Sequence, residues 1–195
     1  MIFRSFIFAL SSAALFTLTL LPLHAGENDS ETGFISLFNG VDLTGWRYAD
    51  SDPFDGKVQA SDGRYSARDG IFIVNPALGA PRKVAQIWTV REFPTNFILR
   101  LEFRAAYNAD SGIFLRKPQL QCRDYLVAGP YKQLKHYKAE DWNEIEVVVR
   151  DSVARCTCNG EVLEEAYKLP ATGPIGLEAD RGQMEYRNIR IKELP

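Results

Sequence analysis

Carboxylates and guanidinium groups are concentrated in one region, and such side chains can move protons and hold hydroxyl groups. Glu102 and Arg104 have the same parity in a run that reads as a strand, so both project from one face. A turn at Asp110-Ser-Gly then leads to Arg116. A carboxylate can act as a general base, and a nearby cation can stabilise the oxyanion that forms. The same charges could instead form a structural pair worth roughly 0.2 to 1 kcal/mol.

Other polar residues offer further candidates. Gln121 and Asp124 differ in parity, so a regular strand sends them to opposite faces and only a bulge would reconcile them. Ser111 lacks the Gly-x-Ser-x-Gly elbow of a nucleophilic serine. Trp142 could stack on a sugar ring, although a tryptophan at the start of a sandwich strand more often packs in the core.

Histidine and metal chemistry have little support. The chain has two histidines, and only His136 remains once residues 1–25 are removed, which rules out a histidine-based triad or a site with several histidines. A divalent metal could occupy an Asp-rich loop such as Asp50 to Asp55, but the spacing does not establish one. We therefore assign no metal ligand and no certain cofactor.

The elements that must position these residues read as short strands. In Phe97–Arg104 apolar residues alternate with charged ones, so one face belongs to a core and the other is polar. The same split recurs in Glu144–Val149 and Met184–Ile191. The run Val147–Cys158 leads into Asn159-Gly160, which is the strongest hairpin signal. These patterns predict an all-β sandwich of two antiparallel sheets.

The amino terminus has the pattern of a secretory signal peptide. Arg4 precedes an uncharged apolar run from Phe6 to Leu21, Pro22 interrupts it, and Ala25 provides a small residue for cleavage. We expect a periplasmic or secreted protein that has no membrane contact after cleavage. The expected organisation is a signal peptide over residues 1–25, a linker over 26–33 and one domain over 34–195.

Charge argues against nucleic acid as a partner. Removal of the signal peptide changes the net charge from −2 to −3, because Arg4 is its only charged residue. No Lys/Arg run is longer than the pair Arg82-Lys83, so the sequence offers no basic patch.

Three cysteines would face an oxidising compartment, which permits at most one disulfide bond and one free thiol. Cys156 and Cys158 are too close to pair easily. We expect all three to be buried and to behave as small apolar residues. One disulfide bond from Cys156 or Cys158 to Cys122 is compatible with this expectation.

Several motifs recur in a characteristic order. They are Phe38-Asn-Gly-Val-Asp-Leu-Thr-Gly-Trp46, Asp69-Gly70-Ile, Ile87-Trp-Thr, Phe97–Arg104, Ser111-Gly-Ile-Phe-Leu-Arg116, Trp142-Asn-Glu144, Asn159-Gly160, Gly173-Pro-Ile-Gly-Leu177 and Tyr186–Leu194. In order and spacing they resemble a family of exported bacterial domains named for 3-keto-disaccharide hydrolysis, or for 3-keto-glucoside lyase and 3-keto-2-hydroxy-glucal hydratase activity. The resemblance covers nearly the whole chain after the expected signal peptide.

This resemblance implies a concanavalin A-like jelly roll whose concave sheet binds sugar. The family often has Leu-Gln-Asp-His-Gly before its final strand, where this chain has Leu177-Glu-Ala-Asp-Arg181. Asp180 thus replaces a histidine, and a member without a catalytic histidine would have changed its base, changed its substrate or lost activity.

The implied substrate is a sugar already oxidised at its third carbon. The ketone acidifies the neighbouring carbon-bound proton, a carboxylate removes it, elimination expels the glycosidic oxygen, and water adds back. The expected base is Glu102, or else Glu178 or Asp180. The expected substrate contacts are Arg104, Ser111, Arg116, Gln121, Asp124, Trp142 and Arg187. The chemistry also implies a sugar 3-dehydrogenase upstream as a partner.

Two other functions compete with this one. A non-catalytic carbohydrate-binding module is the main alternative, because the fold also serves lectins and fold does not dictate function. The change at Asp180 favours that alternative. A hydrolase of intact glycosides comes third, since no convincing pair of carboxylates is apparent.

Overall fold

The computed structural model describes residues 32–76, 85–127 and 129–195. Gly33–Pro195 form one compact unit, while the expected signal peptide and most of the linker lie outside the described residues. The described residues form thirteen strands and no α-helix, so none of them belongs to a helix that could cross a membrane. The strands are β1 (Ile35–Ser36), β2 (Trp46–Arg47), β3 (Tyr65–Arg68), β4 (Ile71–Val74), β5 (Ala85–Glu92), β6 (Phe97–Ala105), β7 (Asp110–Leu115), β8 (Gln119–Arg123), β9 (Asn143–Arg150), β10 (Val153–Cys158), β11 (Glu161–Lys168), β12 (Pro174–Ala179) and β13 (Met184–Glu193).

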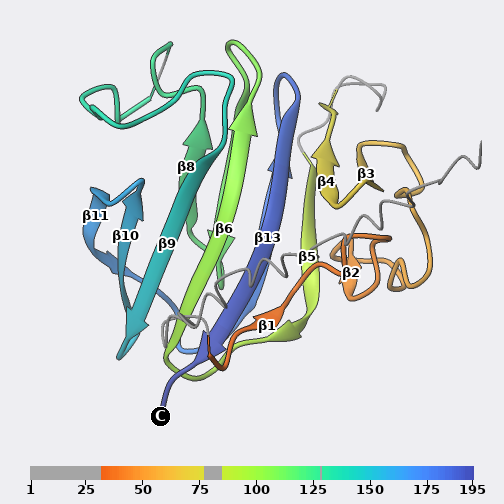
Figure 1. Cartoon of the computed structure of the whole chain (residues 1–195). Coiled ribbons are helices and arrows are strands. Elements are labelled where there is room, and N and C mark those ends of the chain that lie inside the picture. Colours follow the sequence, from red (N-terminus) through yellow and green to blue (C-terminus); the bar gives the residue numbers. More distant parts are fainter. Residues whose placement is uncertain (1–31, 77–84, 128) are drawn as a thin grey trace, which may run out of the picture. The chain divides into compact units, whose positions relative to one another are not determined.

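These strands form two antiparallel sheets (Figure 1). The larger sheet has the order β11-β10-β9-β6-β13-β4-β3, and β1 joins it by pairing with β13. The smaller sheet has the order β2-β5-β12-β7-β8. The predicted all-β sandwich, with the architecture of a concanavalin A-like jelly roll, is confirmed.

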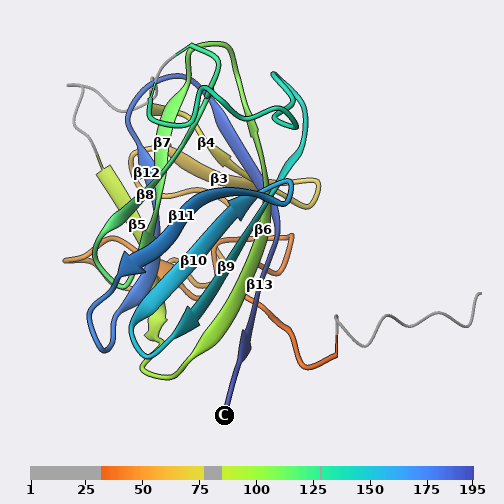
Figure 2. The same cartoon turned by 90° about the vertical axis from the view of Figure 1, so that its left-hand side faces the viewer.

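The two sheets lie face to face, with β5, β7, β8 and β12 in one layer and β6, β9 and β13 in the other (Figure 2). The core between them is rich in large aromatic side chains. Phe72 packs edge-on against Trp46 and Tyr65, with ring centroids 5.0 Å and 6.3 Å away. All three side chains are fully buried, and removal of such large apolar surfaces from water is the main force that holds the sheets together.

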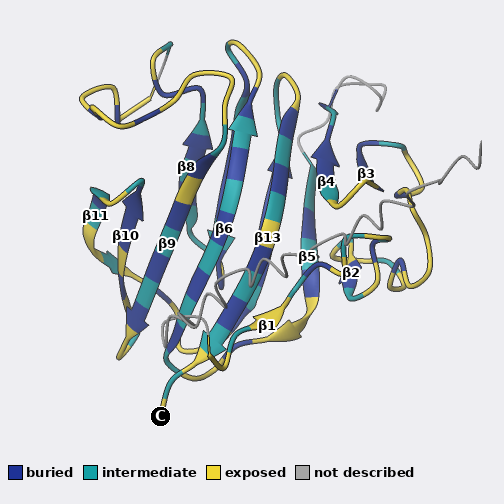
Figure 3. Cartoon of the chain, viewed as in Figure 1, coloured by how far each residue is buried: buried dark blue, intermediate teal, exposed yellow. Residues whose placement is uncertain are grey.

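The larger sheet shows the alternation that the sequence predicts. Along β6, buried residues such as Leu99 and Leu101 alternate with half-buried ones such as Arg100 and Glu102 (Figure 3). The half-buried residues lie on the outer face, away from the smaller sheet. β9 and the first part of β13 follow the same rule.

Two tight turns shape the β9-β10-β11 region. Asn159 and Gly160 both have positive φ, 47° and 82°, as a type I′ hairpin requires, so the predicted hairpin joins β10 to β11. Asp151 and Ser152 also have positive φ, 48° and 63°, and they divide the run Val147–Cys158 into two strands. The second turn lacks a glycine, which explains its weak sequence signal.

The three cysteines are buried, as expected, and none is bridged, so the bridge to Cys122 is not formed. Burial raises the pKa of the Cys156 and Cys158 thiols to about 12. A thiol with so high a pKa is scarcely ionised and therefore reacts slowly.

Candidate functional site

Glu178 is a carboxylate that the fold has withdrawn from solvent. It lies on the outer face of β12 in the smaller sheet, and its residue exposure is only 9%. Gln86 of β5 donates from Nε2 to Glu178 Oε1 over 3.1 Å, and Gln119 of β8 donates to the other carboxylate oxygen. Side-chain amides from β5, on one side of β12, and from β8, on the other side, thus hold the Glu178 carboxylate.

The surroundings of Glu178 favour its protonated form. Burial raises the pKa of the carboxyl above its ordinary value, and the negative charges of Asp180 and Asp110 act in the same direction. The amide hydrogen bonds from Gln86 and Gln119 oppose this shift only in part. A carboxylate that is costly to ionise is a stronger base once ionised, and such groups are common at functional sites.

Two glycines form the floor beside Glu178. A Cβ atom on Gly112 would lie 2.0 Å from Nε2 of Gln119, and one on Gly176 would lie 2.6 Å from Cε3 of Trp88. The two larger side chains therefore lie flat over the strands where the glycines leave room. Glycine is needed here for close approach rather than for turn geometry.

Aromatic residues adjoin the carboxylate on one side. Trp88 of β5 is half-buried, and its ring lies 5.0 Å from that of Phe114 on β7, tilted by 54°. Register pairs Gly176 with both residues, so Trp88, Gly176 and Phe114 form one row across the sheet. Half-exposed aromatic faces of this kind can pack against the apolar faces of sugar rings and aglycones.

Charged residues adjoin the carboxylate on its other side. Asp110 forms ion pairs with Arg123 over 2.9 Å and with Arg181 over 3.5 Å, and Arg181 Nε also donates to the carbonyl of Asn108. Asp180, which follows β12, adds negative charge near Glu178. Three kinds of side chain thus follow one another on the outer face of the smaller sheet. The aromatic row of Trp88 and Phe114 comes first, the Glu178 carboxylate with its amides lies in the middle, and the ion pairs of Asp110 lie on the far side.

Ser111 does not reach this face. Its side chain is completely buried, and its Oγ donates to the backbone carbonyl of Glu178 over 2.7 Å and lies 2.9 Å from the Tyr186 hydroxyl. Tyr65 similarly donates to the carbonyl of Leu177 over 3.1 Å. These core hydroxyl groups hold the backbone of β12 from beneath.

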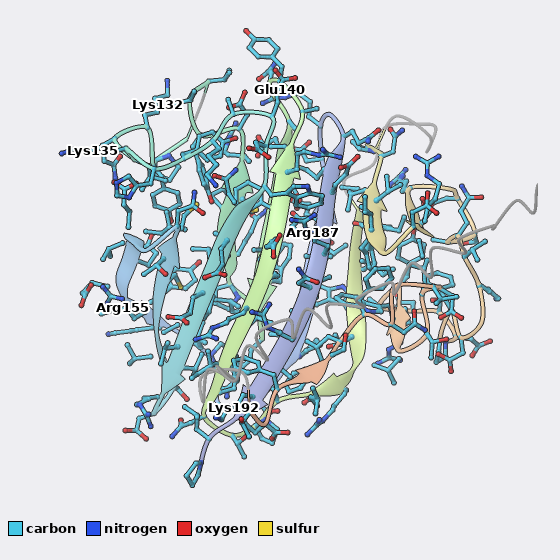
Figure 4. The ribbon with its side chains drawn as sticks, in the orientation of Figure 1. Lys132, Lys135, Glu140, Arg155, Arg187 and Lys192 are labelled. Carbon is cyan, nitrogen blue, oxygen red and sulfur yellow. The ribbon has the colours of Figure 1, made fainter. Side chains whose placement is uncertain are left out.

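Glu102 lies on the other sheet. Arg187 binds one Glu102 oxygen through Nε and Nη2, both at 2.6 Å, and Asn188 donates to the other over 2.8 Å. A bulge in β13, where Asn188 has φ 52°, turns these two successive side chains to the same outer face. Figure 4 shows Arg187 on β13, in the larger sheet.

Arg104 and Trp142 complete the cluster around Glu102. The guanidinium carbons of Arg187 and Arg104 lie 4.0 Å and 4.9 Å from the Trp142 ring centroid, and Arg104 Nε donates to Glu185 over 2.8 Å. Four of the predicted site residues are therefore brought together, but on the outer face of the larger sheet. Glu178 and Gln121 belong to the smaller sheet, and Asp180 directly follows its strand β12.

Arg116 and Asp124 are both buried. Arg116 donates to the carbonyls of Phe93, Thr95 and Pro170, at distances between 2.6 Å and 2.8 Å, and so ties three chain segments together. Asp124 follows the end of β8 and accepts hydrogen bonds from the backbone N–H of Asn108 and from the Tyr137 hydroxyl.

Several neighbours of Glu178 were not among the residues predicted from the sequence. Gln119 and Gln121 are two residues apart in β8, and Gln86 and Trp88 are two residues apart in β5. The sequence alone therefore indicates that the members of each pair project from the same face of their strand. What the sequence did not show is that β5, β12 and β8 belong to one sheet, because they are far apart in the chain.

Within the described ranges, no group of three or more His, Cys, Asp or Glu side chains is arranged to hold a metal ion. The loop Asp50 to Asp55 lies within these ranges, and its Asp55 accepts a hydrogen bond from the backbone N–H of Gly45.

Two solved structures of proteins from Parabacteroides distasonis ATCC 8503, provisionally described as glycosyl hydrolases, resemble the chain. The first is 18% identical, with a TM-score of 0.64, and the match covers 84% of this chain and 95% of that chain. The second is 20% identical, with a TM-score of 0.57 and coverages of 76% and 99%. The exoplasmic/lumenal domain of VIP36, in a form bound to Ca²⁺ and Man3GlcNAc, is 8% identical, with a TM-score of 0.51 and coverages of 84% and 89%.

At these identities the structural likeness concerns the fold. The comparison with curated protein sequences gives no match. A family model, described as the 3-keto-alpha-glucoside-1,2-lyase-like domain, matches residues 33–192 and therefore nearly every described residue. The chain belongs to the family of 3-keto-alpha-glucoside-1,2-lyase-like domains.

Proposed function

We propose that this protein cleaves 3-keto-glycosides by elimination and hydration, with Glu178 as the base. The observation that carries the proposal is the state of Glu178: a nearly buried carboxylate with a raised pKa, held by two amides beside a half-exposed aromatic row. Membership of the family supports a 3-keto-glycoside as the substrate class.

The reaction needs one base and a donor for the developing oxyanion. Glu178 removes the proton from C2, next to the C3 ketone, and an enolate forms. The enolate then re-forms the ketone, a C1–C2 double bond is made, and the C1–O bond to the aglycone breaks. The aglycone leaves as an alcohol after it gains a proton. Water finally adds across the double bond, with hydroxyl to C1 and hydrogen to C2, so the net result is hydrolysis.

The amides around Glu178 suit the second requirement. Each glutamine side chain has two N–H donors, so Gln86 and Gln119 can hold the carboxylate with one and offer the other to a substrate oxygen. Gln121, whose Nε2 donates to the side-chain Oε1 of Gln119 over 3.3 Å, adds a third amide to the same surface. Fixed dipoles in a partly buried site stabilise charge more effectively than water does.

Glu102 is less suited to be the base. Both of its oxygens already accept hydrogen bonds from Arg187 and Asn188, so a base there would have to break an ion pair. We also propose that the protein acts after export, on sugars that a separate 3-dehydrogenase has oxidised. The apolar run from Phe6 to Leu21, followed by the small residue Ala25, supports export.

The test uses the chain without residues 1–25 and a 3-keto-glucoside, with loss of the keto-sugar followed by its absorbance at alkaline pH. The Glu178→Gln variant should fold and lose turnover, whereas the matched Glu102→Gln variant should retain it. Parallel reactions with EDTA report any metal requirement. Glycan binding without turnover by the unmodified chain would select the binding-module alternative, and full activity of Glu178→Gln would remove this residue as the base.

A further inference from the structure

A hollow of about 230 Å³ lies on the outer face of the smaller sheet, at the end where β12 begins. Its apolar lining comes from Trp88 and Val90 of β5, Pro174 of β12 and Ala49. Trp88 is thus shared between the hollow and the aromatic row beside Glu178.

The hollow also carries positive charge. Arg47, on edge strand β2, and Lys117, in the turn between β7 and β8, both line it and are exposed. Among the described residues neither makes an ion pair. Arg116 adds a third cation, whose N–H groups are already bound to backbone carbonyls. Glu92, the one acidic residue among the described lining residues, accepts a hydrogen bond from Thr172.

The position of the hollow fits a leaving group. Trp88 and Gly176 lie two residues along their strands from Gln86 and Glu178, which is a separation of about 7 Å. A ligand whose C2 proton faces Glu178 can therefore extend over Trp88 into the hollow. The hydroxyl-rich ring would face the amides and the ion pairs of Asp110, while the apolar lining would receive the aglycone.

We propose that this hollow is the aglycone subsite and that it selects an aromatic aglycone carrying an anionic group, such as a carboxylate. The ring packs on Trp88, Val90 and Pro174, and the anion pairs with Arg47 and Lys117. The proposal rests on the assignment of Glu178 as the base, because that assignment fixes the direction in which the leaving group points.

The experiment compares two substrates of the same shape, the 3-keto-glucosides of 4-hydroxybenzoate and of 4-hydroxybenzamide, each as both anomers. The carboxylate substrate should have a kcat/KM about tenfold higher, since a hydrogen bond to a charged group contributes more than one to a neutral group. The preference should fall as NaCl is added. The Arg47→Gln/Lys117→Gln double variant should abolish the preference, because its kcat/KM for the carboxylate substrate should fall to the level of its kcat/KM for the benzamide substrate.

Matched controls are Arg155→Gln and Lys132→Gln. Arg155 of β10 is paired with Glu165 of β11, and Figure 4 labels Arg155 and Lys132 on the left of the view, away from β5. These variants should keep the preference. An equal kcat/KM for the two substrates, or a preference that survives in the double variant, would overturn the proposal.

A binding measurement separates this proposal from the assignment of the base. Titration of the chain with free 4-hydroxybenzoate and free 4-hydroxybenzamide needs no turnover, and the benzoate should bind more tightly to the unmodified chain but not to the double variant. If Glu178→Gln keeps its activity while the benzoate preference persists, only the base is wrong. If Glu178→Gln is inactive and both ligands bind equally, only the subsite is wrong.

Discussion

The side chain of Gln119 occupies the space over Gly112 that a larger residue would need. Its Nε2 lies 2.0 Å from where a Cβ atom on residue 112 would stand, and the same amide nitrogen donates to the carboxylate of Glu178. On the other side of Gln119, the Tyr167 hydroxyl donates to its backbone carbonyl over 2.7 Å. The absence of a side chain at position 112 thus determines how the carboxylate is held.

Gly112→Ala should therefore impair activity more than stability. The new methyl group must displace Gln119, and misplacement of a group beside the base should lower kcat/KM roughly 10- to 100-fold. Steady-state kinetics and a thermal melt measure the two effects. Gly112→Ala/Gln119→Ala should melt higher than Gly112→Ala, because the clash is gone, but should stay poorly active. Normal activity in Gly112→Ala would contradict this role of Gln119.

Glu178→Gln should change the way stability depends on pH. The pKa of Glu178 is raised in the folded state, so the folded chain holds this proton more tightly than the unfolded chain does. The unmodified protein therefore loses stability as pH rises from the unfolded value of about 4.3 through the folded value. Glutamine does not ionise, so the variant escapes this loss.

Urea unfolding near pH 3.5 and near pH 7.5 measures the difference. The variant should gain stability relative to the unmodified chain at the higher pH, while Glu102→Gln, which loses an ion pair, should not. A variant that gains nothing between the two pH values would show that Glu178 ionises normally. In kinetics, the acidic limb of kcat/KM should lie above the range of an ordinary glutamate.

Asn143→Ala should destabilise the fold without a direct effect on chemistry. Asn143 is completely buried, and its amide donates to the carbonyls of Lys138 and Asp141 and accepts from the Lys138 N–H and the Asn159 side chain, all over 2.8 Å. Loss of these bonds leaves buried polar groups unsatisfied, at a cost of about 2 to 4 kcal/mol. Denaturant unfolding measures it. The control Asn96→Ala removes one bond from a half-exposed residue and should cost much less, and equal costs would disprove the argument.

The cysteines give a prediction about covalent state. Thiol titration of unreduced protein with Ellman's reagent should detect no reactive thiol in the native chain and all three after unfolding in urea, because the thiols are free and buried. A single thiol in urea would instead reveal a disulfide bond. Mass measurement before and after alkylation provides an independent check.

The strands of the larger sheet could be predicted well because burial on one face imposes a period of two. The alternation predicted strands over Phe97–Arg104 and Met184–Ile191, and both are strands in the structure. The bulge at Asn188 could not be predicted, since one residue with positive φ leaves little trace in an alternating pattern. It nevertheless decides that Arg187 and Asn188 share a face.

The candidate site was harder to predict because parity identifies a face but not a sheet. Glu102 and Glu178 both read as carboxylates on strands, and only the strand order places them on different sheets. Parity also showed that Gln121 and Asp124 diverge, and the structure places Gln121 on the outer face and Asp124 in a buried position. Ser111 and Gly112 are neighbours in one motif, yet Ser111 points into the core whereas Gly112 lies on the outer side of the sheet, where Gln119 covers it.

The hydroxyl groups of Tyr65 and Ser111 have a consequence for how this domain can diversify. They anchor the backbone carbonyls of Leu177 and Glu178 from the interior, whereas Arg47 and Lys117 lie at the periphery on an edge strand and a turn. Under the proposed mechanism, mutations at the periphery can therefore alter which leaving groups are accepted while Glu178 keeps its place. A lineage with this architecture can explore new substrates in single mutational steps, without first rebuilding its chemistry.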